Sequence, residues 1–142
     1  MRTKKNIIIL FLIAVLLSCS SPKEVKVDTS GISTTATAMK KIEMIKEAYI
    51  KKNMDQIKDL INVDTYRLLK LQLKNFDEAT LTFNPIWVEI SKETIQLTCA
   101  WEGNWKLDKK VTKERGVAIF VLQADNMKLS QILRSSPFIF PQ

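Results

Sequence analysis

The chain has 142 residues, with 22 lysine and arginine side chains against 15 acidic ones, two cysteines, three glycines and no histidine. The lack of histidine excludes Ser-His and Cys-His nucleophile systems and every histidine metal site, and three scattered glycines exclude a glycine-rich phosphate loop. We therefore expect neither a metal nor a cofactor. The net charge of +7 is dispersed in lysine pairs without interleaved aromatic residues, so nucleic acid is not an expected partner.

A basic start followed by a short apolar run opens the chain. Arg2, Lys4 and Lys5 precede residues 7–17, which carry no charge. A helix that spans a membrane needs about 20 apolar residues, so this run is too short, and the pattern is that of a secretory signal peptide. The run ends in Leu16-Leu17-Ser18-Cys19, which resembles the lipobox of bacterial lipoproteins. That resemblance implies that residues 1–18 are removed and that Cys19 receives a lipid such as palmitate.

The lipid would decide where the protein is found. Two or more acyl chains anchor a protein stably, at about 0.8 kcal/mol per buried CH₂. In Gram-negative lipoproteins a serine such as Ser20 after the cysteine favours the outer membrane, facing the periplasm; otherwise we expect the outer face of the cytoplasmic membrane. The alternative is an ordinary secretory cut that leaves Cys19 as a free thiol. Residues 19–37 are rich in serine, threonine and lysine, and we expect them to be a flexible tether.

Helical periodicity begins near residue 36. Apolar residues recur at helical spacing, which predicts an amphipathic helix over about 36–52. Asn53, with Gln56 three residues later, predicts the cap of a short second helix, ended by Asn62 in the left-handed conformation. Asp64 is the expected cap of a third helix, whose apolar stripe consists of Tyr66, Leu69, Leu73 and Phe76.

After Phe76 the apolar period changes from 3.6 to 2, which indicates strands. Residues 81–90 and 94–107 alternate, with a phase slip at Pro85 that predicts a bulge. We expect a charged loop over 108–114, a strand over 116–124 that is covered on both sides, and a last strand over 127–134. The apolar tail from Pro137 is expected to be non-helical and to lie back on the body. Helices followed by antiparallel strands make an α+β domain.

This order of elements resembles the nuclear transport factor 2-like superfamily. The residues that carry the resemblance are Ala48-Tyr49, Trp87-Val-Glu-Ile, Trp101-Glu-Gly-Asn-Trp, Arg115-Gly-Val-Ala-Ile-Phe-Val-Leu and Met127-Lys-Leu-Ser-Gln-Ile. The resemblance implies that residues 38–142 form one cone, in which N-terminal helices pack on a curved four-stranded antiparallel sheet. The superfamily includes enzymes, ligand binders and interaction modules, so the fold alone does not decide the function.

In such a cone, aromatic side chains would lie between helix and sheet. The candidate pocket lining is Tyr49, Tyr66, Phe76, Trp87, Cys99, Trp101 and Trp105. These residues form either the wall of a cavity for a small hydrophobic ligand or a filled core. Enzymes of the ketosteroid isomerase or dehydratase kind need a carboxylate in the pocket, and Glu89, Glu93 and Glu102 do not occupy inward positions in the alternation. We therefore expect a non-catalytic binding domain, with such an enzyme as the alternative.

The third strand is apolar on both faces. Phe120 and Leu122 lie on the opposite face from Val117 and Ile119, so we expect Phe120 and Leu122 to form an apolar patch on the outer face of the sheet. Something should cover such a patch. The expected covers are Phe138 and Phe140 of the tail or a second copy in the sheet-mediated dimer that the resemblance implies. Apart from this patch, the expected partner of the binding domain is a small apolar ligand or an envelope protein.

Overall fold

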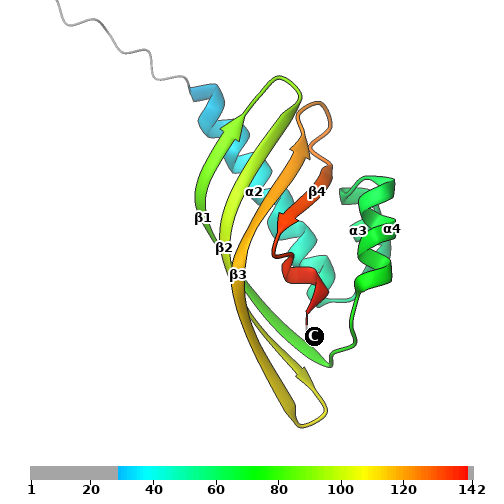
Figure 1. The fold of residues 1–142 in the computed structure, drawn as a ribbon. Helices are drawn as coiled ribbons and strands as arrows, with labels where there is room; N and C mark the ends of the chain where they lie inside the picture. Colours follow the sequence, from blue (N-terminus) through cyan, green and yellow to red (C-terminus); the bar gives the residue numbers. More distant parts are fainter. Residues whose placement is uncertain (1–28, 141–142) are drawn as a thin grey trace, which may run out of the picture.

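The structure, a computed structural model, describes residues 29–140; the predicted signal peptide and Cys19 lie outside these residues. Helices α2 (Thr29–Ile50), α3 (Met54–Leu60) and α4 (Val63–Gln72) precede strands β1 (Glu78–Ile90), β2 (Thr94–Leu107), β3 (Lys110–Gln123) and β4 (Leu129–Arg134), and a 3₁₀ turn, η2 (Pro137–Ile139), follows. The strands pair antiparallel in the order β1-β2-β3-β4 (Figure 1). The prediction of an α+β domain with N-terminal helices on a four-stranded antiparallel sheet is confirmed.

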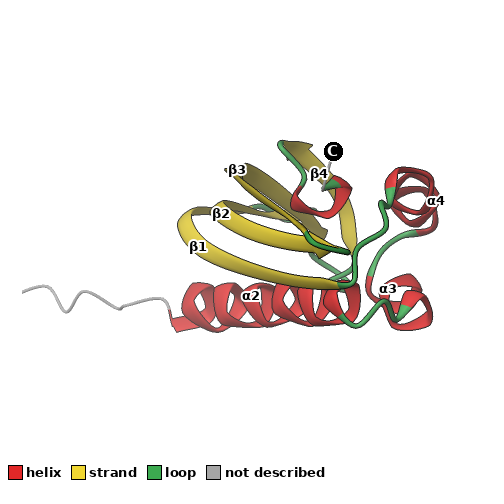
Figure 2. Cartoon of the chain, turned by 90° about the horizontal axis from the view of Figure 1, so that it is seen from below, coloured by secondary structure: helices red, strands yellow, loops and turns green. Residues whose placement is uncertain are grey.

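Helix α2 lies along one face of the sheet, and α3 and α4 stand beside its C-terminal end (Figure 2). Helix α2 buries Ile42 and Ile45 completely, as the helical spacing predicted, and it also buries Ala38. The helix begins at Thr29, so residues 29–37 are helical and the expectation of a tether as far as residue 37 is wrong. Within this extension, Oγ1 of Thr35 donates to the carbonyl of Gly31 at 2.8 Å, which satisfies the hydroxyl within the helix.

Two asparagine side chains cap the short helices. The side-chain oxygen of Asn53 accepts from the N–H of Gln56 at 3.1 Å, as predicted. Asn62 is extended rather than left-handed, with φ −72° and ψ 163°, and it caps α4 in place of Asp64. Its side chain accepts from the N–H of Thr65 at 2.8 Å, and its own N–H donates to the carbonyl of Leu129 at 2.9 Å. An asparagine cap fits the strong preference for this residue at helix starts, and it attaches α4 to β4.

The strands follow the predicted alternation, including the bulge. The register of β1 against β2 shifts between Pro85 and Trp87. Strand β3 begins at Lys110, directly opposite Leu107, so the charged loop predicted over 108–114 is a tight turn at Asp108-Lys109. Asp108 adopts the left-handed conformation (φ 53°) that such a turn requires, and its N–H donates to the carboxylate of Asp77 at 2.7 Å.

The inward and outward faces of β3 are the reverse of our prediction. Phe120 pairs with Leu97 on the helix side and, like Leu122, is 0% exposed. Val117 and Ile119 therefore face outward, because side chains alternate along a strand. Phe120 and Leu122 are core residues, and the prediction that they form an outer patch is wrong. In a run that is apolar on both faces, alternation cannot tell which face meets the helix.

The C-terminal tail lies back on the body, as predicted, but inside the core. It forms the 3₁₀ turn η2 rather than the expected non-helical segment, because Pro137 stands at the start of the turn, where a proline is tolerated. Phe138 is 0% exposed and packs against Tyr49 and Phe83, with ring centroids 5.2 and 6.2 Å away. Phe138 and Phe140 therefore do not cover the outer face. Among the described helices, none is long and apolar enough to cross a membrane.

Candidate functional site

A layer of aromatic rings fills the space between α2 and the sheet. The rings of Trp101 and Trp105 lie 6.4 Å apart, and Phe140 lies 5.3 Å from the first and 5.7 Å from the second. Tyr49 continues the layer from the helix, 5.1 Å from Phe76. Contacts at these distances are those of packed aromatic pairs, so this space is a filled core.

The polar atoms of this layer are bonded to one another and to the tail. Nε1 of Trp105 donates to the hydroxyl of Tyr49 at 2.9 Å, and that hydroxyl donates to the carbonyl of Phe140 at 2.8 Å. Nε1 of Trp101 donates to the carbonyl of Ser135 at 2.8 Å. Burial raises the pKa of Tyr49 to about 12, against the opposing effect of the hydrogen bond from Trp105. Tyr49 is therefore a neutral, structural hydroxyl at ordinary pH.

The candidate pocket-lining residues lie in two different places in the structure. Tyr49, Phe76, Cys99, Trp101 and Trp105 belong to one buried cluster, and Tyr66 packs half-buried against its edge. Burial, with a smaller contribution from Glu43, raises the pKa of the Cys99 thiol to about 11.

Trp87 does not join the cluster, since it is 68% exposed on the outer face of the sheet. Its placement follows from the bulge at Pro85. Before the bulge, Phe83 pairs with the inward Trp101; after it, Trp87 pairs with the outward Thr98. The phase slip in the sequence was the signal that could have placed this residue correctly.

Two of the carboxylates considered in the sequence lie away from the aromatic layer. Glu89 and Glu102 are exposed on the outer face, and within residues 29–140 the fully buried side chains are apolar or aromatic. Over the same range, no three potential ligands gather where they could hold a metal ion.

A row of three apolar side chains and one threonine crosses the outer face of the sheet. Trp87 of β1, Thr98 of β2, Ile119 of β3 and Leu133 of β4 are successive cross-strand partners. Neighbouring strands lie about 4.8 Å apart, so the row spans about 14 Å. Leu133 is 42% exposed. We call these four residues the outer row.

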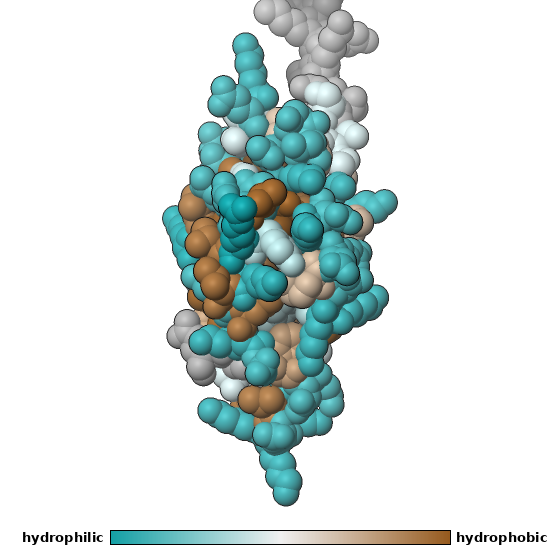
Figure 3. Space-filling view, turned by 90° about the vertical axis from the view of Figure 1, so that its right-hand side faces the viewer, coloured by the Kyte–Doolittle hydropathy of each residue, from teal (hydrophilic) through white to brown (hydrophobic). Residues whose placement is uncertain are grey.

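The outer row continues into a groove between β4 and α4. The groove has a volume of about 520 Å³, and Leu68 and Leu69 of α4 face Ile132 and Leu133 of β4 across it. Leu68 is 61% exposed. Figure 3, which looks onto the side that carries α3 and α4, shows apolar residues gathered on this side of the molecule. Trp87, Leu133 and Leu68 are therefore exposed apolar side chains near one another on this surface, and grouped apolar side chains of this kind can mark an interaction site.

A second, smaller groove of about 210 Å³ lies at the C-terminal end of α2. Tyr49, Ile57 and Phe76 form its buried inner surface, and the exposed Lys52 and Lys74 border it. The sequence left open whether Tyr49 and Phe76 form the wall of a cavity inside the cone or part of a filled core. Both are core residues, and both also border this groove.

Comparisons of the chain with protein families, with curated proteins and with solved structures each found no match. The function therefore has to be inferred from the geometry of the chain itself.

Proposed function

We propose that the mature chain is a lipid-anchored protein of the bacterial cell envelope, and that its single domain is a non-catalytic module that binds an envelope protein through the outer row. The lipobox-like sequence that ends in Cys19 supports the anchor. The domain is proposed to belong to the nuclear transport factor 2-like superfamily, because a long N-terminal helix packs on a four-stranded antiparallel sheet with a bulged first strand.

The observation that carries this proposal is the contrast between the two faces of the sheet. The face toward α2 is filled by aromatic rings whose polar atoms are bonded. The outer face keeps Trp87 at 68% and Leu133 at 42% exposure. Tryptophan is enriched among residues that dominate binding energy at protein interfaces. A protein surface is therefore a better match to this chain than a ligand inside the cone.

The alternative, an enzyme of the ketosteroid isomerase or dehydratase kind, requires an open pocket with an inward carboxylate. In this chain the hydroxyl of Tyr49 and the indole N–H of Trp105 bond to each other across that space. This direct bond favours the binding module.

The anchor is tested by metabolic labelling with radioactive palmitate. The full-length protein should incorporate the label and partition with membranes, and Cys19→Ser should abolish both while leaving the amount of folded protein unchanged. Unlabelled wild-type protein would refute the anchor without bearing on the outer row.

The partner is tested by a photo-crosslinking amino acid at position 98, the centre of the outer row, in the full chain in its own cells. We expect an adduct with a different protein that disappears in Trp87→Ser and in Leu133→Ser. The same amino acid at position 104, which faces outward farther along β2, is the control and should give no such adduct. An adduct with the mass of two copies would assign the face to a dimer, and no adduct at position 98 would also overturn the proposal.

A further inference from the structure

The small groove at the C-terminal end of α2 combines an apolar inner surface with two cationic side chains. Ile57 is 0% and Phe76 4% exposed, and the half-buried Met54 and Leu73 complete the apolar walls. The exposed Lys52 and Lys74 stand at its border. Apolar walls with a few polar groups at fixed positions are the usual composition of a small-molecule site.

Neither of these two lysines has an acidic partner among residues 29–140. The ion pairs there use Lys46, Lys51, Arg67 and Lys106. The nearest neighbour of Lys52 in sequence, Lys51, pairs with Glu47 at 3.9 Å. Lys52 instead places Nζ 5.0 Å from the centre of the Phe76 ring. Two cations without a carboxylate partner beside one apolar groove are complementary to an anion.

The backbone at Lys52 is also unusual. The N–H of Lys52 donates to the carbonyl of Tyr49 at 2.9 Å, and that of Asn53 to the carbonyl of Ala48 at 2.8 Å. These two bonds make a Schellman motif, in which the left-handed position is usually glycine. Lys52 occupies that position with φ 56°, at a cost of about 1–2 kcal/mol for a side chain there. The chain therefore keeps a lysine over Phe76 where glycine would be the more stable choice.

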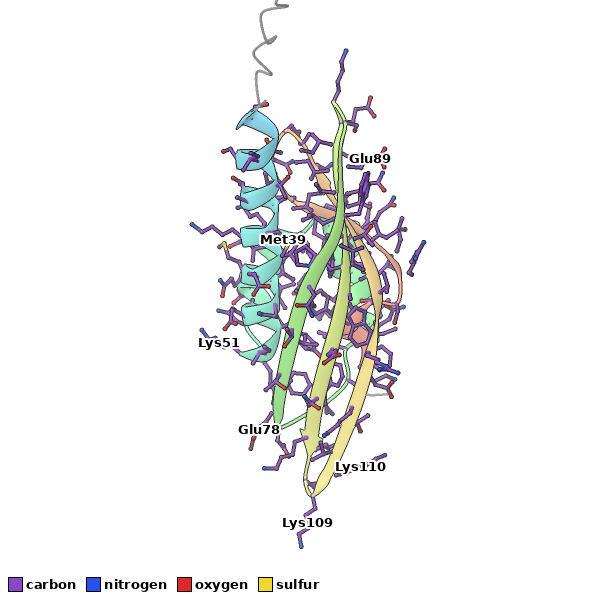
Figure 4. The ribbon with its side chains drawn as sticks, turned by 90° about the vertical axis from the view of Figure 1, so that its left-hand side faces the viewer. Met39, Lys51, Glu78, Glu89, Lys109 and Lys110 are labelled. Carbon is purple, nitrogen blue, oxygen red and sulfur yellow. The ribbon has the colours of Figure 1, made fainter. Side chains whose placement is uncertain are left out.

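Charges of both signs lie at this end of the molecule. Figure 4 shows Lys51, Lys109 and Lys110 toward this end together with Glu78, and Glu89 toward the other end. The carboxylate of Glu78 pairs with Lys106, and that of Glu47 with Lys51, so these carboxylates do not neutralise Lys52 or Lys74.

We propose that this groove binds a short aliphatic carboxylate, with the chain against Ile57, Leu73 and Phe76 and the carboxylate between Lys52 and Lys74. The groove has a volume of about 210 Å³, below the volume of about 300 Å³ that a drug-sized molecule needs, so a smaller ligand is the better match. Each ammonium group adds a charge-assisted hydrogen bond to the carboxylate.

This site is independent of the proposed protein partner, because the outer row lies on the opposite face of the sheet from α2. Its failure would leave the proposal for the outer row untouched, and the reverse also holds.

The experiment titrates the full chain in phosphatidylcholine nanodiscs with hexanoate and follows the methyl NMR signals of Met54, Ile57 and Leu73. We expect saturable shifts of these signals with hexanoate and none with hexylammonium, which has the same chain and the opposite charge. Lys74→Gln should weaken hexanoate binding about tenfold, the effect of one lost charge-assisted bond. Lys51→Gln is the matched control and should leave the affinity unchanged.

A second variant separates binding from folding. Lys52→Gly removes the ammonium group but places the preferred residue at the left-handed position. We expect it to raise the thermal midpoint of unfolding and to weaken hexanoate binding about tenfold. Equal shifts with hexylammonium, no shifts with hexanoate, or full affinity in Lys52→Gly would each overturn the proposal.

Discussion

Tyr49 and Trp105 are joined by a hydrogen bond of 2.9 Å, in which the indole N–H donates to the phenolic oxygen. The same phenol donates to the carbonyl of Phe140 at 2.8 Å. One hydroxyl therefore connects α2, the middle of the sheet and the C-terminal tail. Because Tyr49 is 2% and Trp105 1% exposed, water cannot readily replace either bond.

We expect Tyr49→Phe to destabilise the domain by about 1–3 kcal/mol, since it leaves a buried indole N–H without its acceptor. Urea unfolding followed by tryptophan fluorescence measures the change. Tyr66→Phe is the matched control, because Tyr66 is only half-buried and its hydroxyl makes no hydrogen bond within residues 29–140; it should change stability by less than about 0.5 kcal/mol. Equal effects of the two variants would contradict a structural role for the Tyr49 hydroxyl.

Alkaline pH should lower the free energy of unfolding of the domain through ionisation of Tyr49. The folded state holds the pKa of Tyr49 at about 12, above its ordinary value of 10.0. Between these two pH values the unfolded chain releases a proton that the folded chain retains, so the free energy of unfolding falls as pH rises. The fall is at most about 1.4 kcal/mol per pH unit.

Ionisation of the Cys99 thiol should also lower the free energy of unfolding as pH rises, at slightly lower pH, because burial raises the pKa of this thiol from 9.0 to about 11. Urea unfolding at a series of alkaline pH values should show Tyr49→Phe losing less stability than the wild type between pH 10 and 12. Cys99→Ala should lose less between pH 9 and 11. A variant whose stability falls as steeply as that of the wild type would exclude its residue as a source of the effect.

The tail should be part of the folding unit. Phe138 is 0% exposed and packs against Phe83 and Phe120, so Phe138→Ala should cost about 3–5 kcal/mol, the usual range for a buried phenylalanine. Leu71→Ala, at a position that is 83% exposed, is the control and should lie within about 0.5 kcal/mol of the wild type. Chemical denaturation of both variants measures these changes in the free energy of unfolding. If Phe138→Ala were as stable as the wild type, the tail would not contribute to the core.

How much of this fold the sequence could predict depends on whether a segment has one apolar face or two. Residues 94–107 alternate cleanly, and their odd-numbered side chains from Ile95 to Trp105 are buried as predicted. Residues 117–122 are apolar on both faces, and here the assignment was reversed. Only the register of β3 against β2, which places Phe120 opposite Leu97, determines which face meets the helix.

The candidate site was harder to predict, because it depends on contacts between distant segments. Tyr49 lies 91 positions from Phe140, to whose carbonyl it donates, and no local sequence pattern predicts that hydrogen bond. The tail fills the space that could otherwise have been a pocket. Trp87 is among the residues that we predicted as candidate pocket lining, whereas the bulge at Pro85 turns it outward.

Gly103 provides a sharp test of the aromatic packing. A Cβ added at this position would lie 2.2 Å from Cη2 of Trp105 and 2.8 Å from Cδ2 of Leu81. Gly103→Ala must therefore displace the Trp105 ring, which holds the bond to Tyr49, and we expect a loss of about 1–3 kcal/mol from overpacking. Near-ultraviolet circular dichroism should report the movement of the indole.

Gly31 is the matched control within the same chain. A Cβ there would meet nothing closer than Cδ1 of Ile90 at 4.0 Å, and the residue lies in α2, where alanine is favoured over glycine by about 0.5–1 kcal/mol. Gly31→Ala should therefore stabilise the domain slightly while Gly103→Ala destabilises it. If both substitutions shifted the urea midpoint in the same direction, the contact between Gly103 and Trp105 would not have the importance that the structure assigns to it.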